Sequence, residues 1–199
     1  MYFTTNTLMS QDAILKRKRI TVSDYHRMVE VGILAPDERI ELIHGELIEM
    51  SPSGPLHNSI ITRMHRFLQK KLGDRILIFA QSPISISTHS EPEPDLAIVQ
   101  WQADFYAAKH PEPKDIHWLV EVSDTSLTKD EVVKAPLYAS AGIPVLWMVN
   151  IPSHQLEVFV RPSELGYQQH QVFQVTDQIQ LPNSGIVVPI MELIGPKPE

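Results

Sequence analysis

The clearest periodic pattern in the chain lies between residues 57 and 72. Its apolar positions recur every three or four residues, which places them on one face of a helix. They are Ile60, Ile61, Met64, Phe67, Leu68 and Leu72. The other positions are mostly basic or amide side chains, and Gly73 follows the last turn, where glycine commonly ends a helix. We therefore predict an amphipathic helix that packs its apolar face on a core.

Short apolar runs rich in β-branched or aromatic residues predict buried strands. Such runs cover residues 76–87, 94–99, 118–124 and 145–149. Two shorter runs, on either side of His44-Gly45, predict a tight hairpin over residues 39–50. Residues 155–160 and 168–175 predict a second hairpin or meander near the C-terminus.

Two further helices complete the predicted elements. One covers residues 23–34 and ends before Pro36. The other begins at a capping-box pattern, Thr128 to Glu131, and Pro136 is expected to kink or restart it. The order of elements predicts an α/β or mixed α+β fold with a central mixed sheet flanked by helices. We expect one domain over residues 21–194, after a loose leader (1–20) and before a frayed tail (195–199).

Composition narrows the class of protein. The chain has 199 residues, 43% hydrophobic and 21% charged, without cysteine. Disulfides, thiolate zinc sites and cysteine nucleophiles are excluded, and a cytoplasmic location is expected. No apolar run approaches the roughly 20 residues that cross a bilayer, so no membrane partner is expected. The net charge of −7 disfavours a strong general affinity for phosphate backbones, although it permits a local basic patch.

Two acidic residues lie within the predicted buried strands. Asp95 lies at the start of the run 94–99 and Glu121 in the middle of 118–124, where an unpaired carboxylate would be costly. Because side chains alternate along a strand, Asp95 shares a face with Ala97, and Glu121 with Leu119. If the strands pair, the two carboxylates converge into a hard-oxygen site suited to Mg²⁺ or Mn²⁺. With Lys134 nearby, these are the groups that phosphodiester hydrolysis requires.

Three segments of the sequence resemble those of a known family. They are HGELIEMSPSGPLHNSII, EPDLAIV and LVEVSDTSLTKDEVVKAPLYASAGIPVLWMVN, in that order within residues 21–160. They resemble the Uma family, a bacterial group of restriction-endonuclease-like proteins in the PD-(D/E)XK nuclease superfamily. The resemblance implies a restriction-endonuclease-like core with an added N-terminal hairpin and C-terminal strands. It also implies a metal-dependent endonuclease.

The resemblance implies roles for particular residues. Asp95 and Glu121 match the metal-binding acids, and Glu46 matches a further upstream acid. Lys134 matches a lysine that the family supplies from the following helix, and His57 matches a histidine frequent in the family. The implied cofactor is Mg²⁺ or Mn²⁺. The implied partner is nucleic acid, expected to be DNA, and a homodimer is expected because nucleases that cut both strands often pair.

The residues by themselves leave structural alternatives open. Asp95 could cap a turn, and Glu121 could form a salt bridge with an arginine. Glu46 and Lys134 could be solvated, and His57 could hydrogen-bond at a helix start. The sequence departs from the family pattern around Asp124, Pro136 and Val145. A catalytically inactive binding or assembly module with the same fold is therefore the alternative function.

Overall fold

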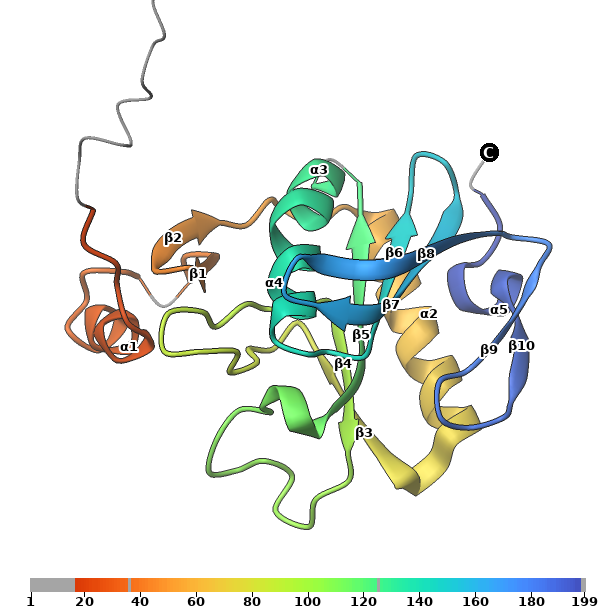
Figure 1. Cartoon of the computed structure of the whole chain (residues 1–199), viewed down its shortest axis with the longest axis horizontal. Helices are drawn as coiled ribbons and strands as arrows, with labels where there is room; N and C mark the ends of the chain where they lie inside the picture. Colours follow the sequence, from red (N-terminus) through yellow and green to blue (C-terminus); the bar gives the residue numbers. More distant parts are fainter. Residues whose placement is uncertain (1–16, 36, 125, 198–199) are drawn as a thin grey trace, which may run out of the picture.

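A six-stranded sheet organises the protein in the computed structural model, which describes residues 17–35, 37–124 and 126–197 (Figure 1). Its strand order is β3-β4-β5-β6-β7-β8. The strands are β3 (Ile76–Ala80), β4 (Leu96–Gln100), β5 (Ile116–Ser123), β6 (Val145–Asn150), β7 (Gln155–Ser163) and β8 (Gly166–Gln174). Neighbours are antiparallel except β5 and β6, which are parallel and are therefore joined by a helical crossover.

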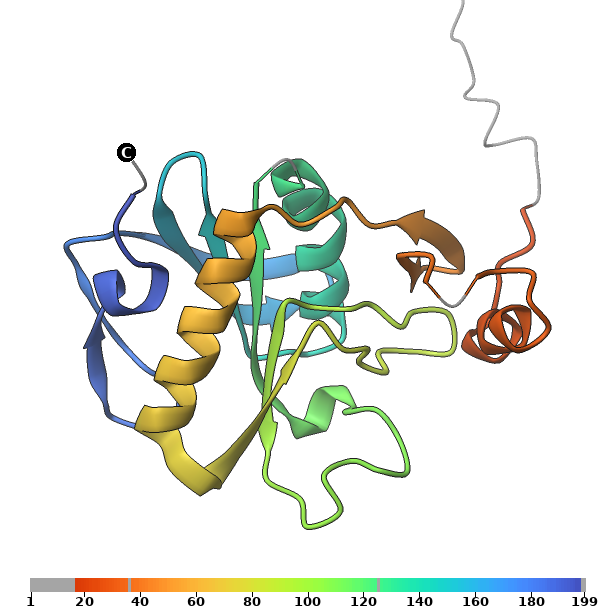
Figure 2. The same cartoon turned by 180° about the vertical axis from the view of Figure 1, so that it is seen from behind.

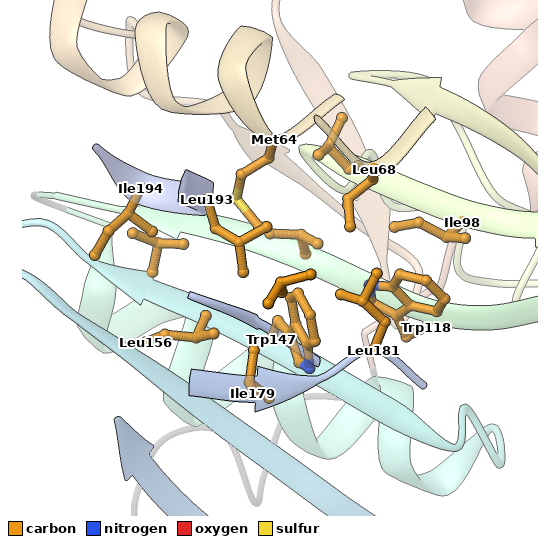
Figure 3. Packing of buried hydrophobic residues seen from close by; sticks show 14 of the residues in the cluster. Met64, Leu68, Ile98, Trp118, Trp147, Leu156, Ile179, Leu181, Leu193 and Ile194 are labelled. Carbon is orange, nitrogen blue, oxygen red and sulfur yellow. The ribbon is translucent and has the colours of Figure 1, made fainter. Parts of the chain in front are cut away.

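Helix α2 (Pro55–Leu72) covers one face of this sheet, as Figure 2 shows from behind. The short helix α5 (Ile190–Ile194) packs beside it. In the chain, α5 follows a separate two-stranded sheet formed by β9 (Gln178–Gln180) and β10 (Val187–Pro189). Side chains from α2, α5 and the sheet form the larger core around Trp118 and Trp147, whose rings lie 5.7 Å apart (Figure 3). The periodic apolar face predicted for residues 57–72 is the face that this core buries.

The opposite face of the sheet carries a second apolar cluster. It joins Ala97 of β4, Leu119 of β5 and Met148 of β6 to Tyr138 of the crossover helix and Ile43 of the N-terminal hairpin. That hairpin consists of β1 (Ile40–Ile43) and β2 (Glu46–Glu49), preceded by α1 (Val22–Glu30). The acids in β5 and before β4 point to this face, as alternation predicts.

The crossover helix passes Pro136 without a break. α3 (Leu127–Lys129) runs directly into a π-helical turn (Asp130–Lys134), and α4 (Ala135–Ser140) continues from it. Proline lacks an N–H group and crowds the preceding turn, so a widened turn just before it relieves both problems. In place of the expected kink or restart, the helix has one widened turn, and Lys134 is the last residue of that turn.

The architecture confirms the predicted mixed sheet flanked by helices. The strand predicted over 76–87 is shorter, since β3 ends at Ala80 and Gln81 adopts a positive φ of 47°. Short helical turns over Gly73–Arg75 and Pro113–Asp115 precede β3 and β5. Most of the predicted leader lies outside the described residues, but Ile20 donates a hydrogen bond to Gly45. Within the described residues, no helix combines the length and apolar character that crossing a membrane requires.

Substitution of Leu68 tests the packing of α2 against the sheet. The side chain of Leu68 is fully buried, whereas Arg66 is exposed two residues earlier on the same helix. We expect Leu68→Ala to lower the free energy of unfolding by about 2–5 kcal/mol, through lost burial and the cavity that remains. Arg66→Ala should change it by less than about 0.5 kcal/mol. Chemical denaturation of both variants measures the difference, and equal losses would contradict this packing.

Candidate active site

A polar pocket of about 80 Å³ lies where β4 begins and β5 ends, beside the first turn of α2. Its walls come from the loop before α2, both strands and the crossover helix. The residues that line it are Arg39, Met50, Ser51, Pro52, Ser53, Gly54, His57, Glu93, Asp95, Glu121, Val122, Asp124, Ser126, Lys129, Asp130 and Lys134. The structure therefore brings four of the five predicted site residues together.

Asp95 lies directly before β4, next to Glu121 across the strand pair. The antiparallel register pairs Leu96 with Val120, so its continuation places Asp95 opposite Glu121. Oδ2 of Asp95 accepts hydrogen bonds from the backbone N–H of Val122 (2.7 Å) and from His57 Nε2 (3.2 Å). These bonds fix the orientation of the Asp95 carboxylate, and Asp95 has 9% of its surface exposed. The other oxygen, Oδ1, has a 3.5 Å contact with Gln81 Nε2.

Glu121 is buried in the middle of β5. Its Oε1 atom accepts hydrogen bonds from the hydroxyl of Tyr138 (2.7 Å) and from Lys134 Nζ (3.2 Å). Burial raises the pKa of Glu121 to about 8, because the lowering effect of Lys134 is smaller and Asp130 and Asp95 add further negative charge. The other oxygen, Oε2, takes part in neither bond.

Lys134 points into the protein from the π-helical turn, with 3% of its side chain exposed. Its Nζ atom lies 3.1 Å from Glu41 Oε2, 3.2 Å from Glu121 Oε1 and 3.4 Å from the carbonyl oxygen of Glu93. Burial alone would lower the pKa of Lys134, but the surrounding carboxylates outweigh it and raise that pKa. The ammonium group is therefore charged and held between two acids from separate elements.

Glu41 is a site residue that the sequence analysis did not single out. It is fully buried in β1, and its two oxygens contact different lysines: Lys129 at 3.0 Å and Lys134 at 3.1 Å. The signal was present in the sequence, because Glu41 is an acid within the apolar run Arg39-Ile-Glu-Leu-Ile. The same argument that selected Glu121 applies to it.

Glu46 does not join this group, which corrects its predicted placement. Glu46 pairs with Ile43 next to the turn of the hairpin, whereas Glu41 pairs with Ile48. The two acids are therefore separated by two residue positions, about 7 Å, along the hairpin. The side chain of Glu46 is 59% exposed and lies 3.6 Å from Arg17. The hairpin thus supplies an acid to Lys129 and Lys134, two lysines that line the pocket, and this acid comes from β1 rather than β2.

His57 and Asp130 support the pocket through hydrogen bonds. Burial by itself would lower the pKa of the His57 imidazole, but the hydrogen bond and the negative charge of Asp95, together with a contact to Asn58, outweigh burial and raise that pKa. Asp130 Oδ2 accepts hydrogen bonds from the hydroxyls of Ser123 (2.8 Å) and Ser126 (2.7 Å). Asp130 therefore joins the end of β5 to the start of the crossover helix.

The donor set suits a hard divalent cation that keeps part of its hydration. Asp95 and Glu121 line one pocket, and each has an oxygen outside its strong hydrogen bonds. Among the described residues no three acids or histidines are grouped to hold a metal. Mg²⁺ commonly binds through one or two carboxylates and completes its shell with water and substrate phosphate. The residues present fit that mode and do not fit a fully protein-ligated metal.

The buried state of Glu121 predicts a pH dependence of stability. Its pKa is about 8 in the folded protein against an ordinary value of 4.5, so between these values the folded state holds a proton that the unfolded state loses. The contribution of Glu121 to the free energy of unfolding is thus present below pH 4.5 and lost as the pH rises towards 8. Glu121→Gln should remove this decline in metal-free urea titrations. Glu46→Gln should keep it, and identical profiles for wild type and Glu121→Gln would refute the assignment.

Glu41 and Glu46 form a matched pair for testing the lysine cluster. Glu41→Gln removes the negative charge that faces both Lys129 and Lys134, and an uncompensated buried ammonium is costly. We expect a loss of about 3 kcal/mol in the free energy of unfolding at neutral pH. Glu46→Gln, in the exposed pair with Arg17, should cost less than about 1 kcal/mol. Equal effects in guanidinium titrations would show that the cluster does not contribute to stability.

Comparison with known proteins places the chain in a family. A search of curated proteins finds no match. The crystal structure of "a putative nuclease belonging to DUF820" from Anabaena variabilis has a TM-score of 0.65 with this chain at 16% sequence identity, covering 88% of this chain and 97% of the other. At that identity the likeness shows the fold. Residues 22–185 match the family Uma2, described as "Putative restriction endonuclease". Because the match covers most of the chain, the protein belongs to the Uma2 family.

Proposed function

We propose that the protein is a metal-dependent endonuclease that hydrolyses phosphodiester bonds in nucleic acid, with DNA as the expected substrate. The observation that carries the proposal is the convergence of Asp95, Glu121 and Lys134 in one pocket of a nuclease-like fold. The family description and the structural neighbour, itself described as "a putative nuclease", support the same reaction class.

Asp95 and Glu121 would hold the divalent cation, Mg²⁺ or Mn²⁺. A bound cation supplies a Lewis acid for a phosphoryl oxygen and lowers the pKa of a coordinated water molecule. The backbone N–H of Val122 and the imidazole of His57 fix Asp95 for this role. We assign His57 a positioning role, because it contacts a carboxylate that would bind the metal.

Lys134 would stabilise the negative charge that develops on the phosphoryl group, or orient the attacking water. Its charge is secured by Glu41 and Glu121, and its buried position excludes the bulk water that would screen that charge. Glu41 is a positioning residue that acts through the lysine. It takes the place of Glu46 as the upstream acid of the proposed site.

Cleavage assays with conservative variants test the proposal. Plasmid and single-stranded substrates are incubated with increasing Mg²⁺ or Mn²⁺ and with wild type, Asp95→Asn or Lys134→Met. We expect metal-dependent cleavage by wild type and a loss of about 100-fold or more in each variant, since each lacks a group proposed to act on the transition state. Glu46→Gln should retain activity. Circular dichroism verifies folding, and equal cleavage by all four proteins would rule out this active site.

One observation favours the alternative, an inactive module that keeps the fold. Lys134 is already paired with two carboxylates, and no three-ligand metal group is formed within the described residues. Calorimetry separates the two functions. Absence of Mg²⁺ or Mn²⁺ binding at millimolar concentration supports the module, whereas binding that Asp95→Asn abolishes supports the nuclease. The homodimer expected from the sequence stays a prediction, and the proposed nuclease function does not depend on it.

A further inference from the structure

The outer face of α2 carries a local excess of positive charge. The helix has 18 residues and contains neither Asp nor Glu, although the chain as a whole has a net charge of −7. Its cations are Arg63, Arg66, Lys70 and Lys71, and all four are exposed. The apolar face of the helix explains its place in the fold, but packing does not require this concentration of basic residues.

These four cations lack neutralising partners. Across residues 17–35, 37–124 and 126–197, no carboxylate oxygen lies within 4.0 Å of any of them. Lysines elsewhere in the same residues do form such pairs, as Lys109 and Lys114 do with Glu112. The charge on α2 is therefore available to an external anion.

Three of these cations, Arg63, Arg66 and Lys70, line a hollow of about 630 Å³ beside α5. Its lining residues are Pro55, Asn58, Ser59, Thr62, Arg63, Arg66, Phe67, Lys70 and Glu192. Besides the three basic side chains, the amide of Asn58 and the hydroxyl of Ser59, from the first turn of α2, provide hydrogen-bond donors at the hollow. Arg63 packs over Gly195 at the end of α5, with its Nε atom 2.8 Å from the point where a Cβ atom would stand.

The hollow lies next to the active-site pocket, on the other side of the first turn of α2. Gly54 and His57 line the pocket, and their neighbours Pro55 and Asn58 line the hollow, so the first turn of α2 lies between them. From Asn58 to Lys70 the helix extends about 18 Å. This length corresponds to about five nucleotides of one strand of B-form DNA.

We propose that the outer face of α2 binds the phosphate backbone of the nucleic acid substrate on one side of the scissile bond. The inference rests on the proposed nuclease function for the identity of the ligand. Contacts from Arg and Lys to phosphates set the position of a strand without reading its bases, so the binding is independent of sequence. The face compensates locally for the acidic charge of the chain, which would otherwise repel the substrate.

Charge reversal on this face tests the inference. The affinity of full-length protein for a fluorescently labelled duplex oligonucleotide is measured in EDTA, which prevents turnover, over a range of salt concentrations. We expect Arg66→Glu/Lys70→Glu to weaken binding by about tenfold or more and to reduce the slope of log K against log salt by about 1.8, or 0.9 for each lost phosphate contact. Glu192→Gln, which removes the acid from the hollow, should strengthen binding.

The matched control is Arg27→Glu/Arg161→Glu, which makes the same change in net charge at exposed positions outside α2. It should leave the slope unchanged. An equal loss in both double variants, no loss in either, or no binding by wild type overturns the inference.

Cleavage of the same duplex with Mg²⁺ separates this inference from the proposed function. If wild type and the α2 variant cleave with equal KM, the function stands and the inference fails. If wild type does not cleave, but binds the duplex through Arg66 and Lys70, the inference stands and the function fails.

Discussion

A buried ammonium group held between the side chains of Glu41 and Glu121 is the interaction on which the pocket depends. Removing Lys134 from water costs several kcal/mol, and only close, charged partners offset that cost. Glu41 comes from the N-terminal hairpin and Glu121 from the central sheet, with Lys134 on the crossover helix between them. The three elements are therefore fixed relative to one another by the same contacts that assemble the candidate site.

The backbone geometry of the crossover helix serves this interaction. A π-helical turn ends at Lys134, two residues before Pro136, and the regular helix resumes without a break. π-turns within helices are frequent at functional sites, because the widened turn redirects side chains that a regular helix would place elsewhere. In this protein the proline and the inward lysine are two aspects of one local structure. Tyr138, one turn later, adds its hydroxyl to the same carboxylate of Glu121.

The protein separates its charges between the two sides of the sheet. The acids that surround Lys134 lie on the face covered by the crossover helix, and the cations of α2 lie beyond the opposite face. A metal between Asp95 and Glu121 would reduce the negative potential of the pocket, while the basic helix would draw a polyanion to its edge. The proposed function requires both, since the net charge of −7 opposes association with an acidic polymer.

The sequence by itself determined the features that follow from local periodicity. Alternation in two strands placed Asp95 and Glu121 on one face, and helical spacing defined the buried side of α2. The apolar run around Glu41 was enough to mark it as a candidate in the sequence, but its contacts with Lys129 and Lys134, and the exposure of Glu46 on the same hairpin, were decided by tertiary packing. The direction of Lys134 also depends on packing, since a regular helix through Pro136 would have aimed it differently. Periodicity reports which face of an element is buried, whereas the partner that a buried charge meets is decided by elements distant in the chain.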